Sequence, residues 1–367
     1  MNNIIPVSTK TAAGQKNTIP PLTIGIDLGD RWSQLCFLNA EGEILEKGRL
    51  KSSPHSFRQR FEALAPARIA IEAGTYSPWV QELLTELGHE VLVANARELR
   101  AISTSDRKND QADAEKLARY ARVDPSILRP ITHRDSHTQA DLLVIRARAA
   151  LVRMRSLAIN AVRGLIKPFG HRLSACSTDS FVTRCRTELP SQYYALLAPL
   201  LEQIASLTKQ IHSADQQVEQ LTKARYPEAT SLQKVPGVGP LTALTFVLTI
   251  GDEKRFSRSR DVGCYLGLRP RQQQSGERDP QWGITKAGDG YLRLLLVECA
   301  QHVLGVLGPD TALRRWGLRL AERGGKNAKR RAIVAVARKL AVLLHRLWVT
   351  QKPYEPFFGV PAPMINL

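Results

Sequence analysis

Paired cysteines, long apolar runs and aromatic residues are all scarce in this sequence of 367 residues. The five cysteines are scattered without a Cys-x-x-Cys pair, which disfavours disulfides and a structural zinc and fits a reducing cytosol. The longest apolar run, Leu241 to Gly251, is about half of the roughly 20 residues that a membrane span needs. The first residues, up to Pro20, also lack the apolar block of a secretory signal. We therefore expect a cytoplasmic protein without a membrane partner.

Acidic residues are outnumbered by basic ones, 34 to 52, which leaves a net charge of +18. Such a surplus predicts a polyanionic partner, and nucleic acid is the first candidate. Aromatic residues make up only 6% of the chain, and no signature of an RNA-recognition sheet is present. We therefore predict that the protein contacts phosphates rather than reading bases, and that it is nucleoid-associated.

The first part of the chain has the element order of a ribonuclease-H-like domain. A flexible lead is expected over residues 1–21. The apolar patterns then predict strands at Leu22–Asp27, Ser33–Asn39, Ile44–Lys51, Arg68–Ile71 and Val91–Ala94, and helices at Pro54–Leu64, Pro78–Leu87 and Asp110–Arg122. The order β-β-β-α-β-α-β-α predicts a mixed α/β domain of the ribonuclease-H-like (RuvC-like) fold over residues 22–134.

The remainder of the chain is predicted to be helical. Between residues 135 and 225, two long helices are expected at Asp135–Lys167 and Gln192–Thr222, joined by a polar loop at His171–Pro190. The second helix carries a heptad seam, which favours either a helical hairpin or a dimerising coiled coil. The seam consists of Leu197, Leu201, Ile204, Leu207, Ile211 and Val218. A mostly helical domain is predicted over residues 226–350, followed by a tail over 351–367.

Four acidic residues of the first domain predict a metal site. Asp27 closes the first strand and Glu72 follows the fourth, while Asp110 and Asp113 lie one turn apart at the start of a helix. In a ribonuclease-H-like sheet the first and fourth strands are neighbours and the last helix crosses their ends. Four converging carboxylates repel one another unless divalent cations neutralise them, and hard oxygen ligands suit Mg²⁺. Two such ions support phosphoryl transfer.

Other interpretations of these residues stay open at this point. Asp110 is a natural helix N-cap, and Asp27 or Glu72 alone fits a solvated strand end. The segment Gly25-Ile-Asp-Leu-Gly29 also fits the first phosphate loop of actin-like and sugar-kinase ATPases. Those proteins need a second Asp-Gly-Gly-type loop, which this sequence lacks, so a kinase is disfavoured.

Several further motifs make the interpretation specific. They are Gly25-Ile-Asp27, Ile71-Glu-Ala73, Asp110-Gln-Ala-Asp113, Val235-Pro-Gly-Val-Gly239, Gly267-Leu-Arg-Pro-Arg271, Ser275-Gly276, Lys286-Ala-Gly288 and Leu292-Arg293. In this order, over about residues 22 to 346, the sequence resembles the insertion-sequence transposases and recombinases related to Piv-type DNA invertases. Those proteins pair a RuvC-like Asp-Glu-Asp-Asp domain with a C-terminal transposase domain that bears a serine.

The resemblance implies a site-specific DNA recombinase. Asp27, Glu72, Asp110 and Asp113 would bind Mg²⁺, and Ser275 would attack a DNA phosphodiester to form a covalent link. It also implies a structured noncoding guide RNA (bridge RNA) that selects donor and target double-stranded DNA. The helical region would support assembly of dimers into a tetramer, in which the acidic site of one subunit meets the serine of another.

Residues around the serine and near the C-terminus are candidates for nucleic-acid contact. A serine hydroxyl is a weak nucleophile that needs activation, and arginines are suited to clamp a phosphate by paired hydrogen bonds. The hairpin at Gly237 and Gly239 resembles helix-hairpin-helix modules, whose backbone amides bind phosphates. The candidates are Arg269, Arg271, Arg278, Lys286, Arg293, Gly237, Gly239, Lys326, Lys329, Arg330 and Arg331.

Two other functions are compatible with the same residues. One is a metal-dependent endonuclease of the Holliday-junction-resolvase type, in which water attacks and Ser275 is a bystander. The other is a non-catalytic nucleic-acid-binding scaffold with a vestigial acidic site. A protease-like or esterase-like serine site is disfavoured because no His lies near Ser275 in the sequence.

Overall fold

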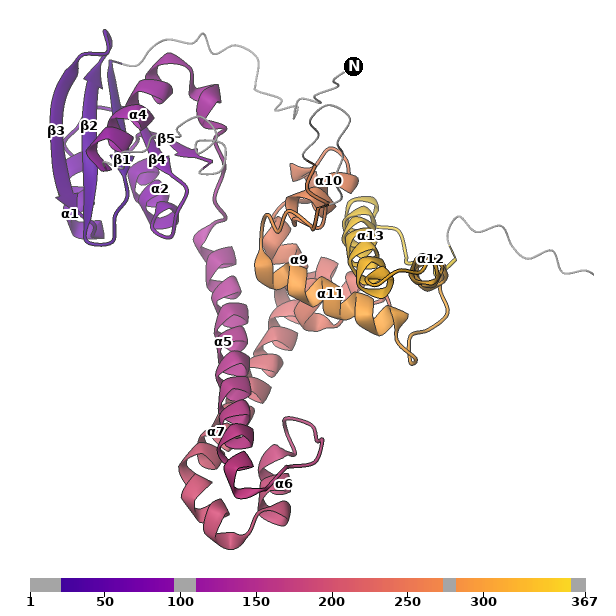
Figure 1. Ribbon diagram of the computed structural model, residues 1–367. Helices are drawn as coiled ribbons and strands as arrows, with labels where there is room; N and C mark the ends of the chain where they lie inside the picture. Colours follow the sequence, from indigo (N-terminus) through magenta and orange to yellow (C-terminus); the bar gives the residue numbers. More distant parts are fainter. Residues whose placement is uncertain (1–20, 96–109, 273–281, 358–367) are drawn as a thin grey trace, which may run out of the picture. The chain divides into compact units, whose positions relative to one another are not determined.

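The computed structural model describes residues 21–95, 110–272 and 282–357 (Figure 1). Most of the predicted lead and of the predicted tail therefore lies outside the described residues. The chain divides into two compact units between Asp135 and Ser136. In the described segments, no helix has both the length and the apolar character to cross a membrane.

The N-terminal unit contains a mixed five-stranded sheet in the order β3-β2-β1-β4-β5. β1, β2 and β3 form an antiparallel meander, whereas β1, β4 and β5 run parallel to one another. The strands are β1 (Leu22–Asp27), β2 (Trp32–Asn39), β3 (Ile44–Lys51), β4 (Arg68–Glu72) and β5 (Glu90–Ala94). The predicted adjacency of the first and fourth strands is confirmed, and the topology is consistent with a ribonuclease-H-like α/β domain.

Helices cover both faces of this sheet. On one face, α1 (Pro54–Phe61) and α2 (Ser77–Glu86) bury apolar side chains such as Phe57 and Val80 against Ile24 and Ile71. On the other face, α4 (Asp110–Val123) packs small residues, including Ala114 and Ala118, against the sheet. The three helices lie within a few residues of the predicted ranges, because strong apolar periodicity defines each of them.

Two long helices open the C-terminal unit. The predicted helices are confirmed as α5 (Ser136–Leu165) and α7 (Ser191–Arg225). The N-terminal half of α5 packs against the C-terminal half of α7, and their other ends also meet, so the pair is an antiparallel hairpin. All six residues of the predicted seam on α7 are buried. The seam therefore serves packing within the chain, which decides between the two structures that the heptads allowed.

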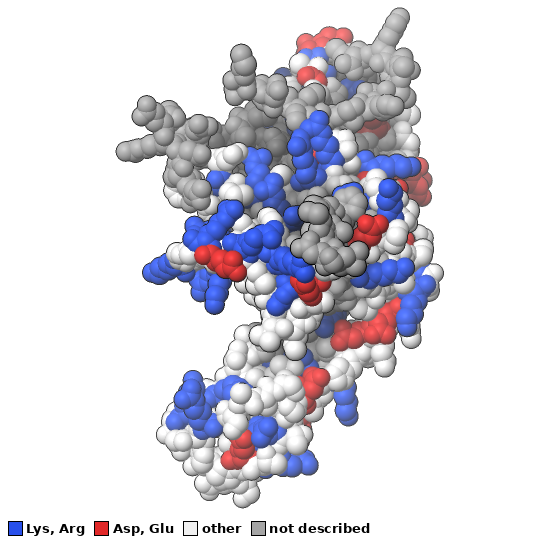
Figure 2. All heavy atoms as spheres, turned by 90° about the vertical axis from the view of Figure 1, so that its right-hand side faces the viewer, with Lys and Arg blue, Asp and Glu red and all other residues white. Residues whose placement is uncertain are grey.

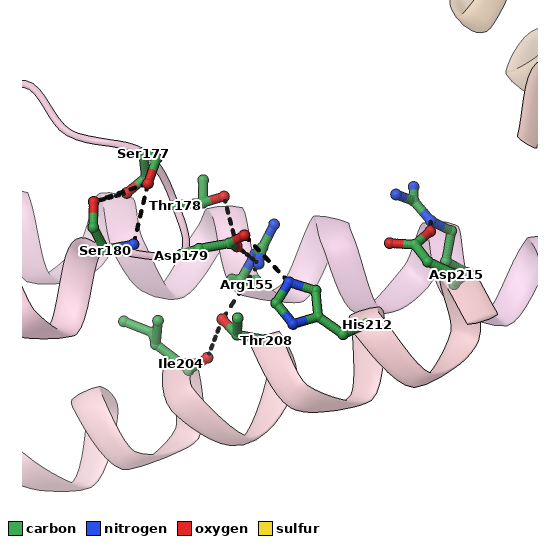
Figure 3. A network of polar contacts seen from close by, with 10 residues as sticks. Arg155, Ser177, Thr178, Asp179, Ser180, Ile204, Thr208, His212 and Asp215 are labelled. Atoms are coloured by element: carbon green, nitrogen blue, oxygen red, sulfur yellow. Dashed lines mark hydrogen bonds and ion pairs between the residues drawn. The ribbon is translucent and has the colours of Figure 1, made fainter. Parts of the chain in front are cut away.

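The segment His171–Pro190, predicted to be a loop, contains a helix. α6 (Phe181–Glu188) buries only Phe181 and Cys185, one turn apart, and this signal is too short to predict a helix. Polar contacts fix the chain before α6 (Figure 3): Arg155 NH1 donates to Asp179 Oδ1 at 2.8 Å, and His212 Nε2 lies 3.2 Å from Asp179 Oδ2. The polar character of the segment thus reflects contacts with α5 and α7.

Six shorter helices complete the unit around a core centred on α9, α11 and α13. Gly324 and Gly325, both with positive φ, separate the last two helices. Part of the predicted tail packs back, because Ala312 N donates to Pro356 O at 2.8 Å and Tyr354 contacts the core. The helices are α8 (Pro227–Leu232), α9 (Pro240–Ile250), α10 (Arg260–Tyr265), α11 (Gly290–Leu304), α12 (Ala312–Glu322) and α13 (Ala328–Thr350).

Candidate active site

The carboxyl ends of β1 and β4 place two acidic side chains on one face of the sheet. Asp27 is the last residue of β1 and Glu72 the last residue of β4, and the two strands are parallel neighbours. Side chains alternate along a strand, so Asp27 shares a face with Gly25, and Glu72 shares one with Ala70. Gly25 faces α4, and Ala70 packs in the cluster that α4 covers. Both carboxylates therefore lie on the α4 side of the sheet.

Gly25 allows α4 to approach β1 closely. A Cβ atom at Gly25 would lie 2.0 Å from Ala114 O and 2.5 Å from Ala118 N, so no larger residue fits. Ala114 is one turn after Asp110, and Asp113 immediately precedes it. This contact brings the first turn of α4 to the end of β1, where it carries two more carboxylates.

Burial and the neighbouring carboxylates change the acidity of Asp27. The pKa of Asp27 is raised from 3.8 to about 6, first by burial and then by the negative charges of Asp110, Asp113 and Glu72. Asp110, Asp113 and Glu72 are thus close enough to Asp27 for their charges to raise its pKa. The sequence prediction that they converge agrees with this effect on Asp27.

The carboxylates do not form a closed coordination shell. Asp113 Oδ1 accepts a hydrogen bond from Lys116 Nζ at 3.0 Å. Across residues 21–95, 110–272 and 282–357, no group of three acidic, histidine or cysteine side chains is arranged to hold a metal ion. The donor set still suits a hard cation, because it consists of carboxylate oxygens, three of whose groups raise the pKa of Asp27 in addition to the effect of burial.

Hydrogen bonds fix the loops that follow β1 and β4. Tyr76 donates to Asp30, which joins the two loops. Gly74 N donates to Ser77 Oγ at 2.9 Å, and Ser77 Oγ lies 2.8 Å from His133 Nε2. Burial is the main cause that lowers the pKa of His133. Sequence reasoning missed these supporting residues, because nothing in the sequence links Ser77 to a histidine 56 positions away.

The predicted nucleophile Ser275 and the nearby Arg278 lie outside the described residues. The two chain segments that flank them form a short antiparallel neck. Thr285 N donates to Arg269 O at 2.9 Å, and Arg271 N donates to Gly283 O at 3.0 Å. Both arginine side chains are exposed. The neck thus holds the ends of the serine-bearing segment side by side.

Close backbone contacts and one arginine brace this neck. Gly267 has φ of +68°, and a Cβ atom there would lie 2.1 Å from Ala287 N. Arg293 NH1 donates to Leu266 O at 2.9 Å and to Ala287 O at 2.7 Å, a bracing role that the sequence did not indicate. Lys286 is exposed beside it. Contact of Arg293 and Lys286 with nucleic acid stays a prediction.

The predicted hairpin lies between α8 and α9. Gly237 has φ of +82° and packs against α11, where an added Cβ atom would lie 3.2 Å from Cys299 O. Gly239 is exposed and precedes the first residue of α9. The turn therefore exposes backbone at the start of a helix, a geometry that is compatible with phosphate contact.

Basic side chains gather on one face of the C-terminal unit, over α12 and α13 (Figure 2). Lys326, Lys329, Arg330 and Arg331 are all exposed there. The buried side of α13 consists of apolar residues such as Val336 and Leu340 in the core. Two separate faces on one helix explain why the basic run coexists with tight packing.

Comparison with known proteins identifies the family of this chain. Residues 24–169 match the DEDD transposase domain of IS110-type elements, and residues 229–316 match the transposase IS116/IS110/IS902 family. A probable family 20 transposase of Pseudomonas aeruginosa is 31% identical over 91% of this chain and 98% of its own length. The chain belongs to the IS110/IS116 family of transposases.

Two further relatives are named as a transposase and as a gene-inverting protein. The transposase for insertion sequence element IS1111A of Coxiella burnetii is 29% identical over 90% of this chain and 91% of its own. The pilin gene-inverting protein of Moraxella bovis is 27% identical over 78% of this chain and 81% of its own. Membership in this family of transposases and DNA invertases implies an enzyme that cleaves DNA. DEDD transposase domains are typically metal-dependent.

Proposed function

We propose that this transposase cleaves and exchanges DNA strands through a covalent serine–DNA intermediate, with Mg²⁺ held by the four carboxylates. The observation that carries the proposal is the raised pKa of Asp27, caused first by burial and then by the negative charges of Asp110, Asp113 and Glu72 at one end of the sheet. When bound, Mg²⁺ supplies positive charge that stabilises the reacting phosphate and acidifies a hydroxyl.

The serine step leaves the number of ester bonds to phosphorus unchanged, because one forms as another breaks. Ser275 Oγ loses its proton and bonds to phosphorus, while the bond from phosphorus to one deoxyribose oxygen breaks. The bonding electron pair goes to that oxygen, which takes up a proton as a free hydroxyl. Reversal of the step by a hydroxyl of another strand releases the serine and completes the exchange. Since Ser275 and the carboxylates belong to different units, we propose that the acidic site of one subunit meets the serine of another.

The basic surfaces support nucleic acid as substrate and guide. The exposed Arg269 and Arg271 lie just before the serine segment in the sequence and are suited to hold phosphates of the substrate. The basic face of α12 and α13 adds positive charge without an aromatic recognition sheet. We propose that base pairing with a structured guide RNA supplies the sequence choice for donor and target DNA.

A second apolar stripe on α5 supports a homo-oligomer. The seam of the α5–α7 hairpin is buried, yet other apolar residues of α5 remain exposed at spacings of three, four and seven. They are Leu143, Ala147, Met154, Leu157, Ala161 and Leu165. Such spacing on a long helix fits a coiled-coil seam with another copy of the same helix. We propose that dimers formed in this way assemble into a tetramer.

Trapping of a covalent adduct tests the proposal. Purified protein with labelled DNA of the element ends, guide RNA and Mg²⁺ is expected to give a denaturation-resistant protein–DNA band. Ser275→Ala should abolish the band, while Ser275→Cys offers a weaker substitute nucleophile. Asp27→Asn should abolish cleavage altogether. Cleavage without an adduct in Ser275→Ala would instead favour the junction-resolvase-like nuclease, and full activity of Asp27→Asn would favour the non-catalytic scaffold.

A further inference from the structure

The C-terminal unit contains a groove between the neck and α13, which Arg271, Arg330 and Arg331 line together with residues to which the proposed function gives no role. The groove has a volume of about 830 Å³, within the roughly 300–1,000 Å³ of small-ligand sites. Its lining includes the apolar residues Leu268, Ile284 and Val334 and the two tryptophans Trp282 and Trp316. A large apolar lining beside a basic face calls for a ligand that is both flat and anionic.

The two tryptophans differ in what covers them. Lys339 Nζ lies 4.3 Å from the ring centroid of Trp316, so a cation occupies one face of that ring. Trp282, by contrast, is 51% exposed. An exposed indole in a groove offers a stacking platform for a planar ring, and every nucleobase has such a face.

The charges around the groove select an anion. Five of its lining residues are basic, and none of the lining residues that the structure describes is Asp or Glu. The five are Arg271, Arg330, Arg331, Arg338 and Lys339. An apolar and aromatic lining combined with several cations is the arrangement by which single-stranded nucleic acid is held, with bases on aromatic rings and phosphates on arginines.

Arg338 links the groove to a second, adjoining cleft. It lines both this groove and a cleft of about 540 Å³ that Arg260 and Arg269 also line. Gly263 makes room for it, because a Cβ atom there would lie 2.8 Å from Arg338 Cγ. Three arginines line this cleft together with one carboxylate, that of Asp261, so a net positive charge continues from the groove into the cleft.

We propose that this groove captures an unpaired base of the DNA strand, stacked on Trp282. The proposal rests on the proposed function, because Gln272 and Trp282 line the groove and flank the serine-bearing segment in the sequence. A base inside a duplex has both faces stacked and cannot reach the indole, so the base must leave the helix. Stacking tolerates any base, so the groove adds affinity and position rather than sequence choice.

Equilibrium binding with and without bases tests this proposal. Ser275→Ala protein is used throughout, so that no chemistry occurs, and fluorescence anisotropy follows a labelled 12-nucleotide single strand. An oligomer of the same length and charge made only of abasic sites is expected to bind about tenfold more weakly, which corresponds to about 1.4 kcal/mol. Trp282→Ala should lower the affinity for the normal strand to that of the abasic one, and Trp282→Phe should restore most of it.

Trp32 provides a matched control, since it is 48% exposed but belongs to the N-terminal unit. Trp32→Ala should retain the difference between normal and abasic strands. Equal binding of the two strands by the starting protein, or an equal loss in Trp32→Ala, would overturn the proposal. Tighter binding of an RNA strand than of DNA through Trp282 would overturn the choice of DNA. Failure of adduct formation by protein with Ser275 intact leaves the binding result unchanged, so the two proposals fail separately.

Discussion

Asp27→Asn should stabilise the N-terminal unit at neutral pH while removing the proposed metal site. The pKa of Asp27 is raised from 3.8 to about 6, so its ionisation opposes folding. A shift of about 2 units corresponds to at most ~3 kcal/mol, and the partial exposure of the side chain reduces this to about 1–2 kcal/mol. Asparagine keeps the shape of the side chain and removes the charge.

The pH dependence of this gain has a defined sign. Because the folded state binds the proton more tightly than the unfolded state, the wild-type protein loses stability as pH rises from about 4 to about 6. The advantage of Asp27→Asn should therefore be near zero at pH 3.8, grow over this window and stay constant above pH 6. Mg²⁺ should narrow the difference at pH 8, because it stabilises the wild-type carboxylates by binding to them.

Hydrogen exchange measured by mass spectrometry reports the stability of the N-terminal unit separately from that of the C-terminal unit. In EDTA at pH 8, peptides from β1 and β4 should exchange about five- to thirtyfold more slowly in the variant, while peptides from α7 should not change. Asp30→Asn is the control, because it removes a carboxylate that Tyr76 hydrogen-bonds on the adjoining loop, and it should give no gain. Faster exchange in Asp27→Asn, or a gain that does not depend on pH, would refute the raised pKa of Asp27.

Three other predictions test the packing and the assembly. Gly25→Ala should destabilise the N-terminal unit by about 3 kcal/mol or more in thermal melts, because the added Cβ atom would lie 2.0 Å from Ala114 O. The control is Gly164→Ala, where the added Cβ atom meets open space, and it should be neutral or stabilising by up to ~1 kcal/mol. Leu157→Glu, on the 66% exposed residue of the α5 stripe, should lower the mass found by light scattering, whereas Leu307→Glu, at an 87% exposed loop position, should not. A mixture of Asp27→Asn protein and Ser275→Ala protein should form the covalent adduct again, because one subunit supplies the intact serine and the other supplies the intact acidic site. The absence of an adduct in the mixture would argue against a site shared between subunits.

Sequence patterns alone predicted the local elements and the acidic residues at their ends. The five strands, the long α5 and α7 helices and the positions of the four carboxylates all follow from apolar periodicity of about two or 3.6 residues. α6 was missed because two buried residues make too short a period. Ser275 stays a prediction based on family resemblance, and it lies outside the described residues.

Only the tertiary structure decided the contacts through which these residues come together. The contact of Gly25 with the backbone of α4 brings Asp110 and Asp113 to Asp27, and it depends on the missing side chain of one residue between two distant elements. In the same way, Arg293 braces backbone carbonyls, and the seam of α7 pairs within the chain. Periodicity describes which face of an element is buried, whereas the partner of that face depends on contacts between residues far apart in the sequence.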